Sequence, residues 1–248
     1  MTIAIMSAMQ EENSHIVDEM KISELENYGS RTYYSGTLAG KDVVVVFSHW
    51  GKVAASITAT CLISKFEVDE IVFVGTAGAV DENLAVGDIV VGNNLYQHDM
   101  DARPIIGQFE IPLLGRPDIS TTPTIRDNLF AAANAFVSDN LKNTEAFKAV
   151  LGEAVGDPKV VKADIASGDQ FVSKSSHAKT VRQSLSDVGC VEMEGAAVAQ
   201  VCESFGIPFG IVRTISDNAN EESEIDFQKF ISDLAPEYAL GIVKRYLG

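Results

Sequence analysis

Glu12 is the first of four acidic side chains whose positions suit acid/base chemistry. At 100° per residue, Glu12 shares a helix face with Met9, whereas Glu11 points away from it. Because Met9 belongs to an apolar stripe, we expect Glu12 to lie beside the buried face of its helix. Burial raises the pKa of a carboxyl group toward the range that suits a general base. An acidic first turn that complements the helix dipole also explains Glu12, and periodicity alone favours that reading.

The segment Glu192-Met193-Glu194 places two more acids between a predicted strand and a predicted helix. Alternation along an extended segment sends Glu192 and Glu194 to one side and Met193 to the other. Two carboxylates at the end of a strand can bind the hydroxyl groups of a sugar, or they can cap the helix that follows. The residues alone favour capping.

Asp217 is the fourth acid, and it follows an apolar strand that contains Arg213. An unpaired buried charge is costly, so Arg213 needs a carboxylate partner. Glu192 and Glu194 are available for this at nearby strand ends. Asp217 taken alone is more typical of a turn than of a catalyst, whereas Arg213 is harder to explain as a purely structural residue.

A glycine-containing segment and a histidine–aspartate cluster are weaker candidates. Gly75-Thr76-Ala77-Gly78 lets the backbone approach a sugar, a base or a phosphate, but it matches neither GxGxxG nor a P-loop. His98, Asp99 and Asp101 lie in a proline-rich loop without a recognised ligand spacing, so we expect no metal site. No GxSxG elbow supports serine–histidine hydrolysis. The sequence therefore predicts neither a metal nor another cofactor.

The elements that must position these residues are predicted as strands alternating with helices. We expect Ser7 to cap a first helix that continues to Met20. In sheets of this kind ligands bind beyond the carboxyl ends of strands, which is where the acids lie. Strands are expected over residues 2–6, 31–38, 42–48, 70–74, 89–91, 160–167, 190–192 and 209–215, and further helices over 53–66, 124–136, 176–185, 195–205 and 226–246.

Two segments lack clear periodicity. Residues 98–123 contain four prolines and two glycines and are predicted to form a long loop. Residues 138–158 are weakly patterned and indicate an insertion. No repeat or linker interrupts the chain, so we expect one domain over residues 1–248. The alternation of elements predicts an α/β fold with three layers, α/β/α, around a central mixed, mainly parallel sheet.

Composition and charge limit the classes of function. The 248 residues are 46% hydrophobic and 22% charged, as in soluble globular proteins. A formal net charge of −16 argues against binding to nucleic acid or to an anionic membrane. The three cysteines have no CxxC spacing, which favours free thiols in a reducing compartment. With no basic signal-peptide region and no apolar run of membrane-spanning length, we expect a cytoplasmic protein with a small-molecule ligand.

Seven short segments follow one another along nearly the whole chain. They are residues 5–12 (IMSAMQEE), 51–55 (GKVAA), 75–78 (GTAG), 86–90 (VGDIV), 167–171 (SGDQF), 191–194 (VEME) and 213–217 (RTISD). Together they resemble the nucleoside phosphorylase/hydrolase superfamily, and more closely its 5′-methylthioadenosine/S-adenosylhomocysteine nucleosidases. Any one of these segments would be a weak indication of the family, so the resemblance rests on their order and spacing along the chain. It implies a nucleoside phosphorylase-like fold, a nucleoside substrate and a homodimer.

The resemblance also implies a catalytic role for three acids. Asp217 would protonate N7 of adenine, Glu12 would accept a proton from the water that attacks C1′, and Glu194 would hold the ribose hydroxyl groups. Glycosidic cleavage passes through a cation-like state, which needs an acid at the leaving base and a carboxylate near the forming cation. The implied substrate-binding positions are Met9, Thr76, Ala77, Gly78, Phe171, Val172, Glu192, Met193, Ser216 and Phe227.

Several features depart from the family pattern. Trp50 stands where an aliphatic residue is common, and Thr76 replaces a serine. Residues 143–158 resemble an insertion, and the loop 98–117 is unusual; in the family this loop region can close the 5′ end of a neighbouring subunit's pocket. The preferred 5′ substituent among methylthioadenosine, adenosylhomocysteine and deoxyadenosine therefore stays open.

Three alternatives remain at this point. A purine nucleoside phosphorylase would use phosphate in place of water, but it would bring extra arginines or serines to bind that anion. A non-catalytic nucleoside-binding or storage protein could share the fold, although Glu12, Glu194 and Asp217 are all present here. Aminofutalosine, a related adenine nucleoside, is another candidate substrate.

Overall fold

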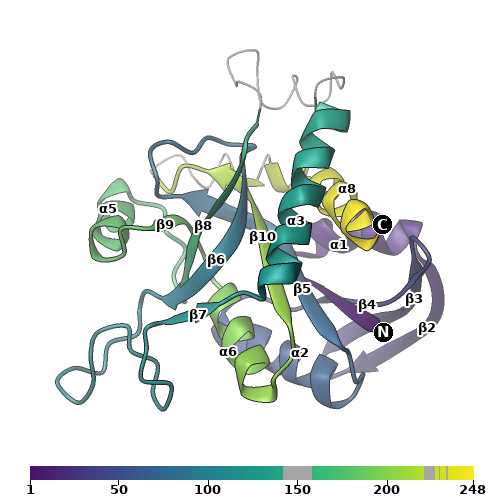
Figure 1. Ribbon diagram of the computed structural model, residues 1–248, viewed down its shortest axis with the longest axis horizontal. Coiled ribbons are helices and arrows are strands. Elements are labelled where there is room, and N and C mark those ends of the chain that lie inside the picture. The colour runs from purple at the N-terminus through teal and green to yellow at the C-terminus, as the bar shows by residue number, and fades with distance from the viewer. Residues whose placement is uncertain (142–157, 221–226, 229, 233) are drawn as a thin grey trace.

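A mixed ten-stranded sheet forms the centre of the computed structural model (Figure 1). The structure describes residues 1–141, 158–220, 227–228, 230–232 and 234–248. The strands are β1 (Thr2–Ser7), β2 (Lys21–Tyr28), β3 (Arg31–Leu38), β4 (Lys41–Phe47), β5 (Glu70–Ala79), β6 (Ile89–Gln97), β7 (Asp118–Ser120), β8 (Val160–Ser167), β9 (Val188–Glu192) and β10 (Phe209–Asp217).

Five of these strands pair in a closed ring. β5 pairs with β10, β10 with β6, β6 with β8, β8 with β9, and β9 again with β5. β1, β4, β3 and β2 extend the sheet from β5 in that order. Within the described residues five strand pairings are parallel and five are antiparallel. The predicted mixed sheet is therefore confirmed, but the expectation that it is mainly parallel is wrong, because hairpins and the strand pairs that close the ring add antiparallel pairing.

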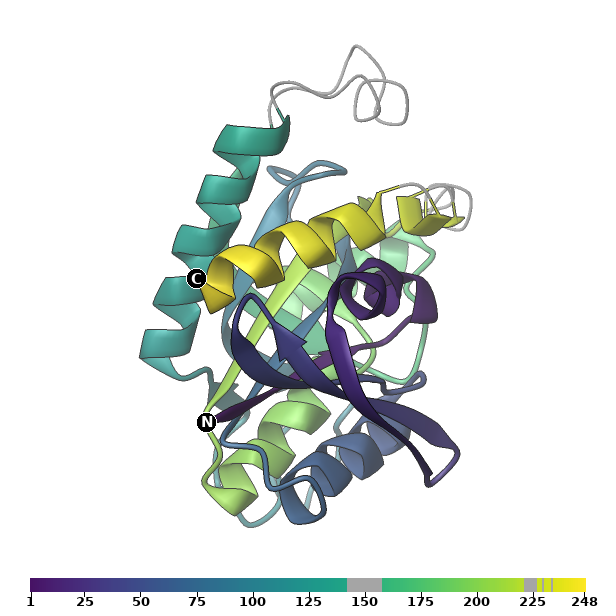
Figure 2. The same ribbon diagram turned by 90° about the vertical axis from the view of Figure 1, so that its right-hand side faces the viewer.

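Helices cover both faces of the sheet, as predicted. α1 (Gln10–Glu19), α3 (Pro123–Phe136) and α8 (Ala235–Leu247) pack on one face, and Figure 2 shows α8 between the other two. α2 (Lys52–Ser64) and α6 (Gly195–Phe205) pack on the opposite face. α5 (Ser175–Ser184) forms a smaller apolar cluster with β9. The three-layer α/β/α architecture is therefore confirmed.

The predicted beginning and end of the first helix are wrong. β1 extends through Ser7, and Met9 is the residue that precedes α1. Glu12 reaches back to accept the N–H of Met9, so the cap comes from Glu12 and not from Ser7, whose hydroxyl donates to the Met9 carbonyl. The helix ends at Glu19, because Met20 has an extended backbone that leads directly into β2.

Other differences concern short or exposed elements. β2 was not predicted; it is an edge strand whose side chains are almost all exposed, so no apolar alternation marks it. β7 lies inside the predicted loop 98–123 and pairs with β6. The last helix does not run unbroken, because a turn at Leu234 precedes α8, and Pro236 stands in the first turn of α8.

Two of the predicted segments lie partly outside the described residues. These are residues 142–157 of the expected insertion, and Asp226, Lys229 and Asp233 of the expected last helix. Residues 137–141 continue α3 as a short π-helix. In the described part of the chain no helix is long and apolar enough to cross a bilayer.

Candidate active site

A cavity of about 400 Å³ lies where the carboxyl ends of β5, β9 and β10 meet the start of α1. Its walls contain every residue predicted for the site from the sequence: Met9, Glu12, Thr76, Ala77, Gly78, Phe171, Val172, Glu192, Met193, Glu194, Ser216, Asp217 and Phe227. Ala8, Trp50, Gln170, Val191 and Gln228 complete the lining. The fold thus gathers four acids from three distant segments around one cavity.

Glu12 is fully buried at the start of α1. One carboxylate oxygen accepts the backbone N–H groups of Ala8 and Met9 at 3.1 and 3.0 Å. The other accepts the backbone N–H and the hydroxyl of Thr76 at 2.9 and 3.1 Å. Burial raises the pKa of Glu12 to about 7, while the charge of Arg213 and the bonds from Met9 and Thr76 act in the opposite direction. Glu12 is therefore a carboxylate suited to accept a proton near neutral pH.

Gly75 allows Glu12 and Arg213 to approach the same stretch of β5. A Cβ atom at this position would lie 3.1 Å from both carboxylate oxygens of Glu12 and 3.2 Å from Nη1 of Arg213. These contacts are tighter than an ordinary van der Waals contact, so a side chain at this position would crowd both groups. Because Gly75 has no side chain, the guanidinium group of Arg213 can lie close behind the carboxylate of Glu12.

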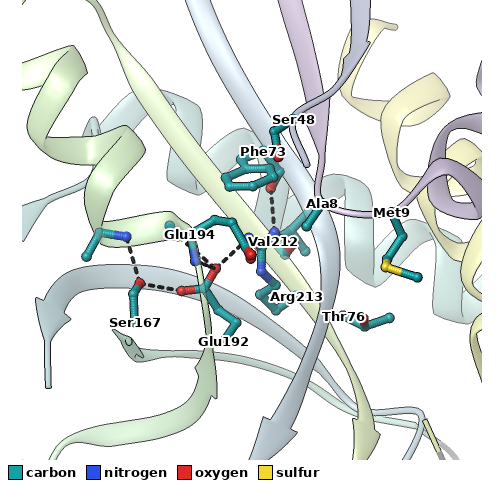
Figure 3. A network of polar contacts seen from close by, with 12 residues as sticks. Ala8, Met9, Ser48, Phe73, Thr76, Ser167, Glu192, Glu194, Val212 and Arg213 are labelled. Carbon is teal, nitrogen blue, oxygen red and sulfur yellow. Dashed lines mark hydrogen bonds and ion pairs between the residues drawn. The ribbon is translucent and has the colours of Figure 1, made fainter. Parts of the chain in front are cut away.

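Arg213 lies behind the cavity and is 1% exposed. Its Nη2 donates to Oε2 of Glu192 at 2.7 Å, as predicted, and its guanidinium group stacks over the ring of Phe73 with 4.1 Å to the centroid (Figure 3). Oε2 of Glu192 also accepts the N–H groups of Gly195 at 2.8 Å and Glu194 at 3.2 Å. A buried charge therefore has the partner that its desolvation requires.

Glu192 both caps a helix and lines the cavity. It lines the cavity, but its carboxylate accepts bonds from Arg213, from the hydroxyl of Ser167 and from the N-terminus of α6. Capping thus occupies Glu192, and Glu194 is left as the acid of this pair that faces the cavity without those bonds. Met193 lines the same cavity, so strict strand alternation does not separate the three residues.

Glu194 is 4% exposed and immediately precedes α6. Its Oε1 accepts the backbone N–H of Gly51 at 2.8 Å. Burial raises the pKa of Glu194, and the neighbouring carboxylate of Glu192 raises it further. The Glu194 carboxyl group therefore titrates closer to neutrality than an exposed glutamate and can donate or accept a hydrogen bond.

Asp217 ends β10 and is 1% exposed. The hydroxyl of Ser216 donates to its Oδ2 at 2.9 Å, and the N–H of Ala219 donates to its Oδ1 at 2.8 Å. The strand pairing with β5 is irregular here and brings Asp217 opposite Gly78. A Cβ atom at Gly78 would lie 2.9 Å from Oδ1 of Asp217, so the glycine makes room for this carboxyl group.

Aromatic and sulfur-containing side chains form much of the apolar wall. Phe171 and Phe227 meet edge to face with 5.8 Å between their ring centroids. Trp50, which is 64% exposed, lines the cavity and donates its indole N–H to the sulfur of Met9 at 2.9 Å. These side chains supply apolar surfaces against which a planar ring can pack.

Of the lining residues that were not predicted, Trp50 had the clearest sequence signal. It stood out as a departure from the family pattern, although no role was assigned to it. Ala8, Gln170, Val191 and Gln228 have no chemical signature of their own. Three of them lie inside the segments 5–12, 167–171 and 191–194 that carry the family resemblance, whereas Gln228 could have been indicated only by its neighbour Phe227.

The charges around the cavity limit what it can bind. Among its described lining residues there is no lysine, arginine or histidine, whereas four are acidic. An anionic ligand is therefore disfavoured, and a neutral ligand with hydroxyl groups and a planar ring is favoured. Buried carboxylates beside such a ligand can move protons to and from it.

Comparisons with known proteins agree with this geometry. The sequence model of the phosphorylase superfamily matches residues 2–248. A 5′-methylthioadenosine/S-adenosylhomocysteine nucleosidase from Shewanella halifaxensis is 35% identical over 243 residues, which cover 98% of this chain and 97% of that protein.

Solved structures give the same result. A 5′-methylthioadenosine/S-adenosylhomocysteine nucleosidase from Colwellia psychrerythraea in complex with adenine has a TM-score of 0.86 and 31% identity, covering 100% of this chain and 95% of the other. The futalosine hydrolase of Helicobacter pylori has a TM-score of 0.84 and 29% identity, covering 98% and 96%. The chain belongs to the phosphorylase superfamily and, within it, to the family of 5′-methylthioadenosine/S-adenosylhomocysteine nucleosidases.

Proposed function

We propose that this protein is an N-glycosidase that hydrolyses 5′-methylthioadenosine and S-adenosylhomocysteine, and 5′-deoxyadenosine in the same class, to adenine and a 5-substituted ribose. The observation that carries the proposal is the convergence of Glu12, Glu194 and Asp217 on one cavity. All three are buried, and each is held by hydrogen bonds from neighbouring backbone.

The proposed reaction divides the work among these acids. A water molecule attacks C1′ and gives a proton to Glu12, while the bond from C1′ to N9 breaks and its electrons pass to the purine. Asp217 protonates N7, so adenine leaves as a neutral base. Glu194 binds the ribose hydroxyl groups near the cation-like centre. The near-neutral pKa of Glu12 supports its assignment as the base.

The remaining lining residues would bind the two halves of the substrate. We assign Phe171, Val172 and Phe227 to the purine, where the facing rings of Phe171 and Phe227 supply an apolar wall. Met9 and Met193 would pack against the sugar. The backbone of Thr76, Ala77 and Gly78 would lie along the ribose and the water. Ser216 would orient Asp217 through its hydrogen bond, and Glu192 would keep the surrounding strands in place through its ion pair with Arg213.

Phosphorolysis is the rival reaction, and the lining argues against it. Phosphate is an anion, and the described lining residues carry acids and no basic side chain. Adenine release from 5′-methylthioadenosine should therefore proceed at the same rate with and without phosphate. A strict requirement for phosphate would show that the protein is a phosphorylase.

An aminofutalosine-type adenine nucleoside is a second candidate substrate. Two observations favour it: the structural similarity to the futalosine hydrolase of Helicobacter pylori, and the indole of Trp50 on the cavity wall. An aromatic 5′ substituent could stack on this indole. Ratios of kcat/KM across a panel of 5′-substituted adenosines will rank the two classes.

We propose in addition that the protein is one domain over residues 1–248 and acts as a cytoplasmic homodimer. Its three cysteines, Cys61, Cys190 and Cys202, are free, which supports a reducing compartment. Val53 and Ile57 lie one turn apart on α2 and are 72% and 46% exposed, an apolar surface that a second copy could cover.

A further inference from the structure

The N-terminus of α2 binds two carboxylates that come from distant parts of the chain. The backbone N–H of Gly51 donates to Glu194 at 2.8 Å, and that of Lys52 donates to Oδ1 of Asp169 at 2.9 Å. Helix N-terminal N–H groups lack partners within the helix and favour negative charge. Gly51 has a φ of 86°, and a Cβ there would lie 3.1 Å from Asp169, so glycine permits this double contact.

The side chain of Lys52 closes a cluster around the same point. Its Nζ donates to Oδ1 of Asp99 at 2.5 Å and lies 3.8 Å from Oδ2 of Asp169. Oδ2 of Asp99 in turn accepts the backbone N–H of Asp169 at 2.9 Å. Each of the three residues therefore contacts the other two. Although burial raises the pKa of Asp99, the bonds from Lys52 and Asp169 lower it below its ordinary value, which keeps the carboxylate charged.

Asp169 lies within the segment 167–172, which forms one wall of the cavity. Gln170, Phe171 and Val172 line the cavity, whereas Asp169 itself does not. The start of the segment is held by two backbone bonds, from His98 to the carbonyl of Ser167 at 3.0 Å and from Gly168 to the carbonyl of Glu192 at 3.1 Å. The bonds of Asp169 to Lys52 and Asp99 then fix the position of Asp169, which directly precedes the first lining residue, Gln170.

From this geometry we propose that Lys52, Asp99 and Asp169 are positioning residues that fix Phe171 and Val172 for binding of the adenine base. The proposal rests on the proposed function, which assigns Phe171 and Val172 to the purine. In this proposal the N-terminus of α2 positions two parts of the site. It binds Glu194, which is assigned to the sugar, and Asp169, which precedes the residues assigned to the base. The two halves of the substrate site are thereby aligned by one rigid element.

The expected effect is on base binding more than on the chemical step. Loss of the Asp169 side chain frees Phe171 and Val172 but leaves the bond between Gly51 and Glu194 in place. Contacts to the base exist both before and during the reaction, so their loss raises KM more than it lowers kcat. A charge-assisted hydrogen bond at a half-exposed site corresponds to about a tenfold effect.

The test measures adenine binding by calorimetry, which needs no turnover. Asp169→Ala should weaken adenine binding about tenfold. Asp169→Asn should recover most of the affinity, because its side-chain oxygen can still accept the N–H of Lys52. A matched control is Asp127→Ala, which removes a comparable ion pair with Lys162 (2.7 Å) far from the cavity lining and should bind adenine as the wild type does.

Steady-state kinetics give a second readout. For 5′-methylthioadenosine, Asp169→Ala should raise KM about tenfold and change kcat by less than about threefold. If Asp169→Ala does not fold, Asp99→Ala removes the acceptor for Asp169 N–H and should weaken adenine binding in the same direction.

A folded Asp169→Ala or Asp99→Ala variant that binds adenine as tightly as the wild type would overturn the proposal. A large fall in kcat with an unchanged KM would also overturn it, since that pattern places the residue in the chemical step. Failure of the wild-type protein itself to bind adenine is a different outcome, because it contradicts the proposed function on which this inference depends.

Discussion

Burial and hydrogen bonding act on Glu12 in opposite directions. Removal from water favours the protonated form, whereas three backbone N–H donors, a hydroxyl donor and the charge of Arg213 favour the carboxylate. The result is a pKa of about 7. Most surface glutamates are far weaker bases, so the position of Glu12 in the fold, and not its residue type, creates the reactive group.

A pH profile tests this assignment. A base accepts a proton only when it is deprotonated, and the protonated fraction of Glu12 grows as the pH falls through about 7. We therefore expect kcat/KM for 5′-methylthioadenosine to fall about tenfold for each pH unit below that value. Glu12→Gln should lose most activity, and its residual rate should lack this acidic limb. A wild-type profile that is flat down to pH 5 would contradict the role of Glu12 as the base.

A contact in the site could be predicted from the sequence where one side chain needs a particular partner. The buried charge of Arg213 demanded a carboxylate, and Glu192 is that carboxylate. The contact between Trp50 and Met9 posed no such problem, because neither side chain carries a charge that requires a partner. It joins residues 41 positions apart in the sequence, so only the tertiary structure reveals it.

The ion pair between Arg213 and Glu192 joins elements, since it connects β10 to the N-terminus of α6 through β9. Arg213→Met would leave the carboxylate of Glu192 buried without its counter-charge. We expect the free energy of unfolding to fall by about 3–5 kcal/mol, the usual cost of breaking a buried pair from one side. Urea unfolding followed by circular dichroism measures this change.

The double variant Arg213→Met with Glu192→Gln provides the control. Removing both charges should restore part of the lost stability, because no unpaired ion remains. If the single and double variants are equally unstable, packing around Phe73 carries the effect and not the ion pair.

Elements with a buried face could be predicted from the sequence, and exposed or short ones could not. The helix at 195–205 was predicted with the bounds that α6 has, because small apolar side chains repeat along its buried face. β2 has no such face, since Ile22, Leu25 and Tyr28 are all exposed. The closed ring of five strands also had no local signal, because pairing partners are fixed by tertiary structure.

In the whole molecule, α2 contributes both to the candidate active site and to an exposed apolar surface. Its N-terminus holds carboxylates of the site, while Val53 and Ile57 face solvent. Exposed apolar residues one turn apart on a helix are typical of an interface. The site and the proposed dimer would therefore share one helix.

Sedimentation velocity tests the dimer. The wild-type protein should sediment as a dimer at micromolar concentration, and the double variant Val53→Glu, Ile57→Glu should be monomeric, because two buried charges at an interface are costly. Ile22→Glu is the matched control, since Ile22 is also 46% exposed but lies on the edge strand β2 and not on α2, and this variant should remain dimeric. A wild-type monomer at every concentration would contradict the proposal.

Asp217, the proposed acid at the leaving base, can be tested with a single substitution. Asp217→Asn keeps the size of the side chain and an oxygen that can accept the N–H of Ala219, but it removes the transferable proton. The rate of adenine release from 5′-methylthioadenosine should fall on the order of 10³-fold, with unchanged melting temperature. A folded Asp217→Asn variant that releases adenine within about tenfold of the wild-type rate would contradict the role of Asp217 as the acid, since general acid catalysis typically contributes about 10²-fold or more.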